Sequence, residues 1–210
     1  MKKISLYFHT IKYLKPIQIY FQVVYFFKKK LGLYTLDFNL KAPNAFLHLK
    51  YETEFINLTH KNNNSFRFLN IEHTFPISID WEYMGYGKLW QYNLAYFDYL
   101  CDHNLSKDLG LAYILDFIQK SQTLKSALEP YPTSLRLINW VRFVSKYKIE
   151  NQVINNSIAQ QASFLHANLE YHLLGNHLLE NAFALFHAGK YLMEEHLLVK
   201  AKRIIISELN

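Results

Sequence analysis

The residues best suited to chemistry on an anionic ligand fall in two short stretches of the sequence. In the first, Asn176 and His177 follow Gly175, so an amide and an imidazole stand side by side. In the second, Arg136 and Asn139 lie one helical turn apart and can face the same cleft, where a guanidinium makes forked contacts with a carboxylate or sulfate. Each stretch also has a structural interpretation, with Asn176 as a helix cap and Arg136 as the partner of an acidic side chain.

Aromatic residues near these stretches suit a sugar ligand, because an aromatic face can stack on a sugar ring. The candidates are Tyr131, Trp90 and Trp140. Aromatic residues at helical spacing are core residues more often than binding residues, so both interpretations stay open.

The remaining reactive residue types predict neither a metal nor a cofactor. The single Cys101 excludes an internal disulfide and a multi-cysteine metal site, and a buried apolar role is expected for it. There is no Gly-rich phosphate loop and no Gly-x-Ser-x-Gly nucleophile elbow. Several histidines cluster late in the chain, but their spacing lacks the paired i, i+4 pattern of a zinc helix: His166, His172, His177 and His187.

The composition indicates a mainly helical protein with a weakly basic surface. Half of the 210 residues are hydrophobic, and only 6 Gly and 5 Pro are present, which is few for a turn-rich all-β protein. The formal net charge of +6 attracts anions such as an acidic polysaccharide or anionic lipid. Nucleic acid is not expected as a partner, because the basic residues are scattered and form no aromatic-studded basic face.

The first 60 residues are predicted to form a basic, aromatic helical leader and the start of an irregular segment. The apolar run from Ile17 to Phe27 is too short to span a bilayer, but with Lys28 to Lys30 behind it, it could make a peripheral membrane contact. A packed aromatic helix is the alternative. No clear signal peptide is visible, so the localisation is left unknown.

Hydrophobic periodicity sets the expected elements. Residues 36–80 are predicted to be irregular with short strands, such as those around Phe46 to Leu49 and Phe66 to Leu69. From Lys88 the period becomes helical, and apolar stripes at Leu89 to Leu100 and at Leu111 to Ile118 predict the first two helices of this part. A third helix is expected to begin near Ser134 as its cap, and a fourth to run from about Asn151 to Leu174 and to end at Gly175. Two more helices are expected before Leu209. Helices of this length with short connections pack as antiparallel hairpins.

Three segments together resemble the heparinase II/III family of polysaccharide lyases: residues 88–100 (KLWQYNLAYFDYL), 130–140 (PYPTSLRLINW) and 169–181 (LEYHLLGNHLLEN). The resemblance covers about residues 66 to 190, and Ala95 departs from it where the family motif has histidine. It implies an α/α toroid of helical hairpins, here incomplete and comprising residues 61–210, and cleavage of uronate-containing glycans by β-elimination. It implies no cofactor.

The resemblance also implies roles for single residues. Asn176 corresponds to the asparagine that holds the uronate carboxylate, and His177 to its neighbour in proton handling or substrate binding. Substrate binding is expected of four further residues: Arg136, Asn139, Tyr131 and Trp90. The expected partner is an acidic polysaccharide, heparan sulfate-like, alginate-like or a bacterial exopolysaccharide. The family's catalytic tyrosine would fall beyond Asn210, so the chain alone is expected to be inactive. The alternatives are a non-catalytic acidic-glycan-binding protein and a helical protein-interaction scaffold.

Overall fold

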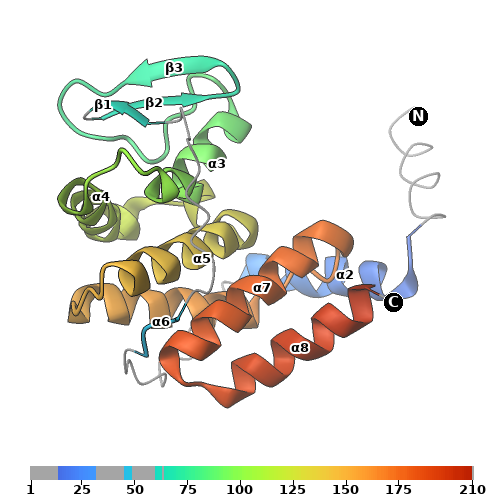
Figure 1. Cartoon of the computed structure of the whole chain (residues 1–210). Coiled ribbons are helices and arrows are strands. Elements are labelled where there is room, and N and C mark those ends of the chain that lie inside the picture. Colours follow the sequence, from blue (N-terminus) through green and yellow to red (C-terminus); the bar gives the residue numbers. More distant parts are fainter. Residues whose placement is uncertain (1–13, 32–44, 49–59, 63, 210) are drawn as a thin grey trace, which may run out of the picture.

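The computed structural model describes residues 14–31, 45–48, 60–62 and 64–209, and these residues are mainly helical, as predicted. Figure 1 shows the elements from the small sheet onward following one another in space much as they do in sequence, from the sheet at one end to the last two helices at the other, whereas the first described helix lies at the end opposite the sheet. None of the described helices is both long and apolar enough to cross a membrane. The α-helices are α2 (Pro16–Leu31), α3 (Lys88–Tyr96), α4 (Lys107–Lys120), α5 (Pro130–Lys146), α6 (Gln152–Ala167), α7 (Gly175–Leu192) and α8 (Glu195–Leu209).

The small sheet is antiparallel and contains β1 (His60–Asn62), β2 (Ser65–Phe68) and β3 (Ile71–Thr74) in that order. Leu69 and Asn70 connect β2 to β3, both with positive φ, which is the conformation of a two-residue hairpin turn. The predicted strand at Phe66 to Leu69 is therefore confirmed, ending one residue earlier. The predicted strand near Phe46 is wrong for residues 45–48, which are irregular, while Leu49 lies outside the described residues.

Two predicted helix boundaries need correction. The helix expected to begin with Ser134 as its cap begins four residues earlier, at Pro130, because proline suits the first turn of a helix. The Ser134 hydroxyl instead donates to the carbonyl of Pro130 at 3.0 Å. The helix expected to reach Leu174 ends at Ala167, and the Asn168 amide donates back to the carbonyl of Phe164 at 2.8 Å.

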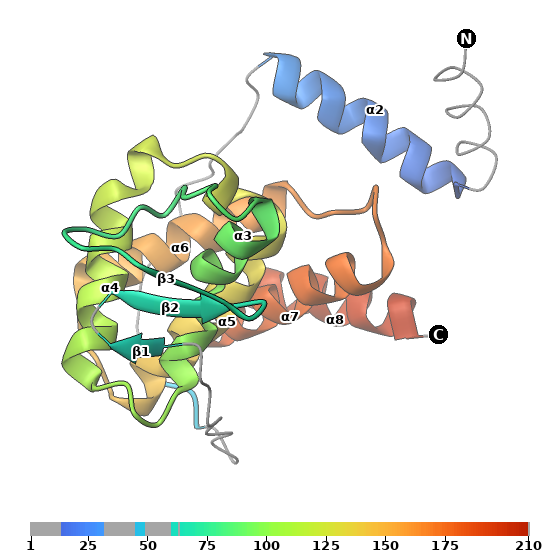
Figure 2. The same cartoon turned by 90° about the horizontal axis from the view of Figure 1, so that it is seen from above.

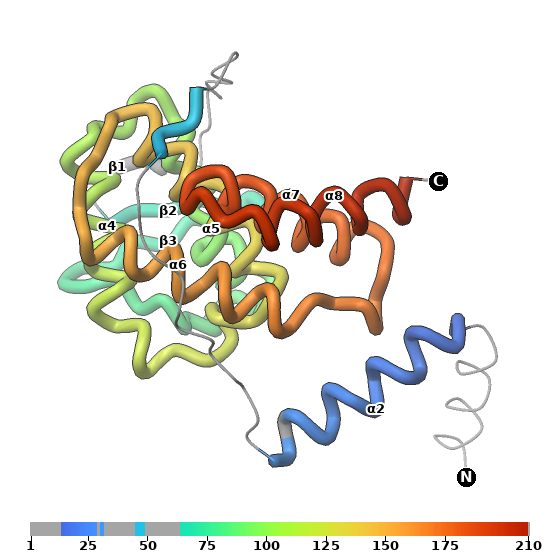
Figure 3. The backbone as a smooth tube through the Cα atoms, turned by 90° about the horizontal axis from the view of Figure 1, so that it is seen from below, coloured from blue at the N-terminus to red at the C-terminus, as the bar shows by residue number. Residues whose placement is uncertain are grey.

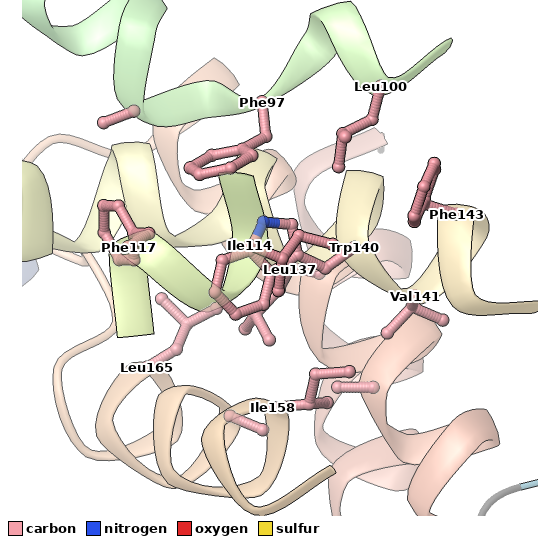
Figure 4. Close-up of a cluster of buried hydrophobic side chains, with 14 of the residues drawn as sticks. Phe97, Leu100, Ile114, Phe117, Leu137, Trp140, Val141, Phe143, Ile158 and Leu165 are labelled. Carbon is pink, nitrogen blue, oxygen red and sulfur yellow. The ribbon is translucent and has the colours of Figure 1, made fainter. Parts of the chain in front are cut away.

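The core is built around Trp140 of α5 (Figure 4). Its ring lies edge-on to the rings of Phe97 and Phe117, at centroid distances of 5.3 and 5.7 Å. Phe97 has a φ of 60°, in the left-handed region that a bulky residue rarely adopts. Burial of its ring between Trp140 and Trp81, which stacks on it at 4.9 Å, offsets that backbone strain.

Helix α2 stands apart from the other helices in Figures 2 and 3. It contacts the rest of the chain along the segment that connects α6 to α7. At the other end of that segment, α7 and α8 lie side by side as a hairpin with Met193 in the left-handed conformation at the junction. The helices thus leave the α6–α7 connection, residues 168–174, between α2 and the body of the protein.

Candidate functional site

Asn176 and His177 lie in the first turn of α7, next to solvent. Leu174 and Gly175 both have positive φ, at 61° and 54°, and this pair reverses the chain into the helix. The Gly175 amide donates to the Glu208 carboxylate of α8 at 2.9 Å, which fixes the helix start against its neighbour. Asn176 is exposed, and the His177 side chain is 42% exposed. Gly175 therefore does reverse the chain, but it opens α7 instead of closing the helix before it.

The imidazole of His177 is held between a carboxylate and a phenol. Its Nδ1 lies 3.3 Å from Oε1 of Glu170, and its ring packs on Tyr131 with the centroids 4.3 Å apart. With a proton on Nδ1 the histidine donates to Glu170, which leaves Nε2 as an acceptor facing away from that carboxylate. This arrangement can orient a histidine for proton transfer.

Glu170 is in turn fixed by a buried amide. Its Oε2 accepts from Nδ2 of Asn181 at 3.0 Å, and its backbone N–H donates to Oδ1 of the same residue at 2.7 Å. Asn181 is fully buried on α7, and its Nδ2 also donates to Ser134 of α5 at 2.9 Å. Because His177 and Asn181 are four residues apart on one helix face, α7 supplies both partners of the same carboxylate.

A row of half-buried tyrosines extends from His177 along α5 and α3. After Tyr131 come Tyr96, at a centroid distance of 6.0 Å, and Tyr92, another 6.3 Å away. Burial, and then the charges of Glu180 and Glu170, raises the pKa of Tyr131. Burial, followed by a hydrogen bond to Glu129, raises the pKa of Tyr92 to about 12. These hydroxyls therefore stay protonated at neutral pH and remain hydrogen-bond donors.

A cavity of about 900 Å³ lies between α2 and the helical body, next to this cluster. Its wall includes Glu129 and Pro130, which directly precede Tyr131, and also Glu170, the carboxylate that holds His177. Tyr25 and Lys28 of α2 line the same space. A volume of this size matches that of pockets for small organic ligands.

Arg136 lies in the interior of the protein, at the wall of a second cavity of about 360 Å³ among α4, α5 and α6. Its side chain is fully buried, and the guanidinium donates to four acceptors while lying over the Phe117 ring at 4.5 Å. Burial lowers the pKa of Arg136 from its ordinary value. The expectation that the Arg136 side chain opens to solvent in a groove is therefore wrong. The acceptors are Gln161 Oε1 at 2.7 Å, Ala127 O at 2.8 Å, Thr133 Oγ1 at 2.9 Å and Ala95 O at 3.3 Å.

Two further predicted substrate contacts are also interior. Trp90 is fully buried, packs on Phe68 at 5.2 Å and donates from Nε1 to the carbonyl of Ile71 at 3.1 Å, so no ring face is left for a sugar. The amide of Asn139, almost completely buried, donates to the carbonyl of Tyr96 at 2.9 Å. The structure thus brings Tyr131 and His177 together near Asn176, and assigns the other candidates to packing.

Sequence reasoning gave no role to Glu170, Asn181 or Tyr96. Glu170 and Asn181 lie within residues 169–181, seven residues before and four residues after His177. The four-residue spacing of His177 and Asn181 indicates that both side chains lie on one face of a helix. Glu170 could not be placed beside them, because the fourth helix was predicted to continue through Glu170, whereas the chain leaves that helix at Asn168 and brings Glu170 back to α7. In the described part of the chain, no three His, Cys, Asp or Glu side chains gather as a metal site would require.

No protein-family model matches the chain, and no match was found among curated proteins or solved structures.

Proposed function

We propose that this chain is part of a polysaccharide lyase of the heparinase II/III type, which cleaves uronate-containing glycans by β-elimination. The observation that carries the proposal is the Glu170–His177–Tyr131 cluster beside Asn176, at the exposed start of α7 and next to a cavity. We further propose that the helices from α3 onward form part of an α/α toroid, which is supported by the side-by-side α7 and α8.

The residue types suit the chemistry. Removal of the proton at C5 of a uronate builds negative charge beside an ionised carboxylate, so that carboxylate must first be neutralised or hydrogen-bonded. In the proposal, the Asn176 amide donates to it, and His177, oriented by Glu170, handles a proton. The C5–H and C4–O bonds break, a C4=C5 double bond forms, and the departing glycosidic oxygen takes up a proton.

Tyr131 and the tyrosines beyond it are proposed to carry the sugar chain. An aromatic ring stacks on the apolar face of a pyranose, and the protonated hydroxyl of Tyr96 can donate to a sugar oxygen. The Tyr92 hydroxyl already donates to Glu129, so it can only accept from a sugar hydroxyl. The carboxylates of Glu170 and Glu180 lie near Tyr131, and their negative charge would repel a polyanionic glycan at this point. Electrostatic attraction therefore does not hold the glycan next to Tyr131. Asn176, the tyrosine row and the basic net charge of the protein supply the binding instead.

A binding test separates this site from the rest of the surface. We expect the chain to bind heparan sulfate, alginate or hyaluronan weakly, and His177→Ala or Tyr131→Ala to lower the affinity about fivefold, as loss of about 1 kcal/mol of contact requires. The matched control is His103→Ala, because the His103 side chain is 44% exposed and lies in the turn that precedes α4. Equal affinity in all three variants, with the fold intact, would refute the proposed site.

Turnover separates a lyase from a protein that only binds. The ultraviolet absorbance of the unsaturated uronate follows cleavage directly. The tyrosine row would also serve a non-catalytic acidic-glycan-binding protein, and binding that depends on Tyr131 without any unsaturated product from a longer form of the protein would favour that alternative.

A further inference from the structure

Helix α2 contacts the protein through a single stripe of side chains, Gln18, Phe21, Tyr25 and Lys28, spaced by three or four residues. The stripe lies along residues 167–173 in the opposite chain direction. The Gln18 amide donates to the carbonyls of His172 and Leu173 at 3.3 Å, Phe21 stacks on Tyr171 at 4.7 Å, the Tyr25 hydroxyl donates to the Leu169 carbonyl, and Lys28 Nζ donates to the Ala167 carbonyl at 3.1 Å.

The opposite face of α2 is apolar and exposed to solvent. At 100° per residue, the positions farthest from the contact stripe are those around Val23. Among them, Tyr20 is 64% exposed, Phe26 63% and Phe27 53%. Figures 2 and 3 show no other described segment covering this side of the helix. A large contiguous apolar surface of this kind marks an interaction site.

The charge around this face is of one sign. Residues 1–36 include seven lysines and no aspartate or glutamate. Lys15 and Lys30 are exposed at the two ends of α2, and Lys30 lies on the apolar side of the helix, away from the contact stripe. A basic helix with an apolar aromatic face has the composition of one that lies in the interface of an anionic bilayer.

We propose that α2 docks the protein on an anionic lipid surface, with Tyr20, Val23, Phe26 and Phe27 inserted at the boundary between head groups and acyl chains. Exposed lysines would pair with the lipid phosphates, and each lysine near such a surface raises the partition coefficient roughly fivefold. This proposal does not depend on the lyase proposal, because the docking face points away from the cavity that Tyr25 and Lys28 line.

A second copy of the chain fits the same face less well. An antiparallel pair of α2 helices would bring Lys15 of one copy close to Lys30 of the other, and a parallel pair would bring identical lysines together. Both pairings repel. An anionic bilayer removes this repulsion and covers the apolar face at the same time.

Vesicle co-sedimentation of the 210-residue chain tests the proposal. We expect binding to vesicles of phosphatidylcholine mixed with phosphatidylglycerol, weaker binding as salt is added, and little binding to phosphatidylcholine alone. The double variant Phe26→Ser/Phe27→Ser should bind at least about tenfold more weakly, because it loses two of the four inserted apolar side chains. The control is Ile77→Ser/Met193→Ser, which removes two residues that are 91% and 69% exposed elsewhere.

Equal binding by the two double variants would overturn the proposal, as would no binding to anionic vesicles by the unmodified chain. A dimer that forms in solution and is lost in Phe26→Ser/Phe27→Ser would assign the face to a second copy. The Phe26 and Phe27 side chains lie outside the contact stripe, so this variant should keep its circular dichroism spectrum and its glycan affinity. That result separates the outcome for docking from the outcome for the lyase proposal.

Discussion

Replacement of Arg136 by alanine decides between a structural and a ligand-binding role for this residue. Arg136 lies on α5, and its guanidinium joins four parts of the protein. It reaches the end of α3 through Ala95, the 3-10 turn Ser126–Leu128 through Ala127, its own helix through Thr133, and α6 through Gln161. We therefore expect Arg136→Ala to weaken the packing of these elements and to leave ligand binding by the folded protein unchanged.

The magnitude follows from the groups left behind. The carbonyls of Ala95 and Ala127 would each lose a buried donor, at about 1–3 kcal/mol per unsatisfied group. The cavity left above the Phe117 ring adds to this, while removal of a buried charge, which burial already disfavours, offsets part of it. A net loss of about 3 kcal/mol is expected, which in a protein of this size lowers the thermal midpoint by about 6–12 °C.

Urea unfolding followed by circular dichroism measures the change, and Arg203→Ala is the matched control. Arg203 is exposed on α8, so its loss should change the unfolding free energy by no more than about 0.5 kcal/mol. Arg136→Lys keeps the positive charge but cannot reproduce the forked contacts, and should fall between the two. An Arg136→Ala protein with unaltered stability and reduced affinity for acidic polysaccharide would refute the structural assignment.

Three other changes have definite expected outcomes. Burial raises the pKa of Asp98 to about 6 from an ordinary 3.8, so its protonated form stabilises the fold below about pH 4, and that contribution is lost as pH rises through 6. In urea titrations, Asp98→Asn should therefore be more stable than the unmodified chain by about 1–2 kcal/mol at pH 8 but not at pH 4. An equal difference at both pH values would contradict this. Gly110→Ala would place a Cβ 2.5 Å from Cζ of Phe143, so we expect a loss of about 1–3 kcal/mol in thermal unfolding despite the better helix propensity of alanine; a raised midpoint would show that Phe143 moves freely. In a form of the protein that turns over glycan, Asn176→Ala should lower the turnover number about 10²–10³-fold, and near-normal turnover would leave Asn176 as a residue of the helix start only.

The helical architecture was predictable because its signal is local. The 3.6-residue period of apolar side chains from Lys88 onward places helices where the structure has them. The error at the end of α6 arose because periodicity reports which residues are buried and not which backbone is helical. Leu169 is buried after the chain leaves the helix at Asn168, so it continued the pattern of α6 without continuing its hydrogen bonds.

The candidate site was less predictable because it depends on which face of α5 meets which neighbour. Arg136 and Asn139 share a helix face, as their spacing requires, but that face packs against α3, and Tyr96 and Ala95 present carbonyls to it. Tyr131, at the start of the same helix, lies where α5 meets the first turn of α7 and so remains beside His177. Spacing alone cannot distinguish these two positions on α5. The buried amide of Asn181 marks the position beside Tyr131. It lies four residues after His177 on a helix that packs on α5, and a buried amide needs a hydrogen-bond partner. That partner is the Glu170 carboxylate, which the α6–α7 connection brings back to α7.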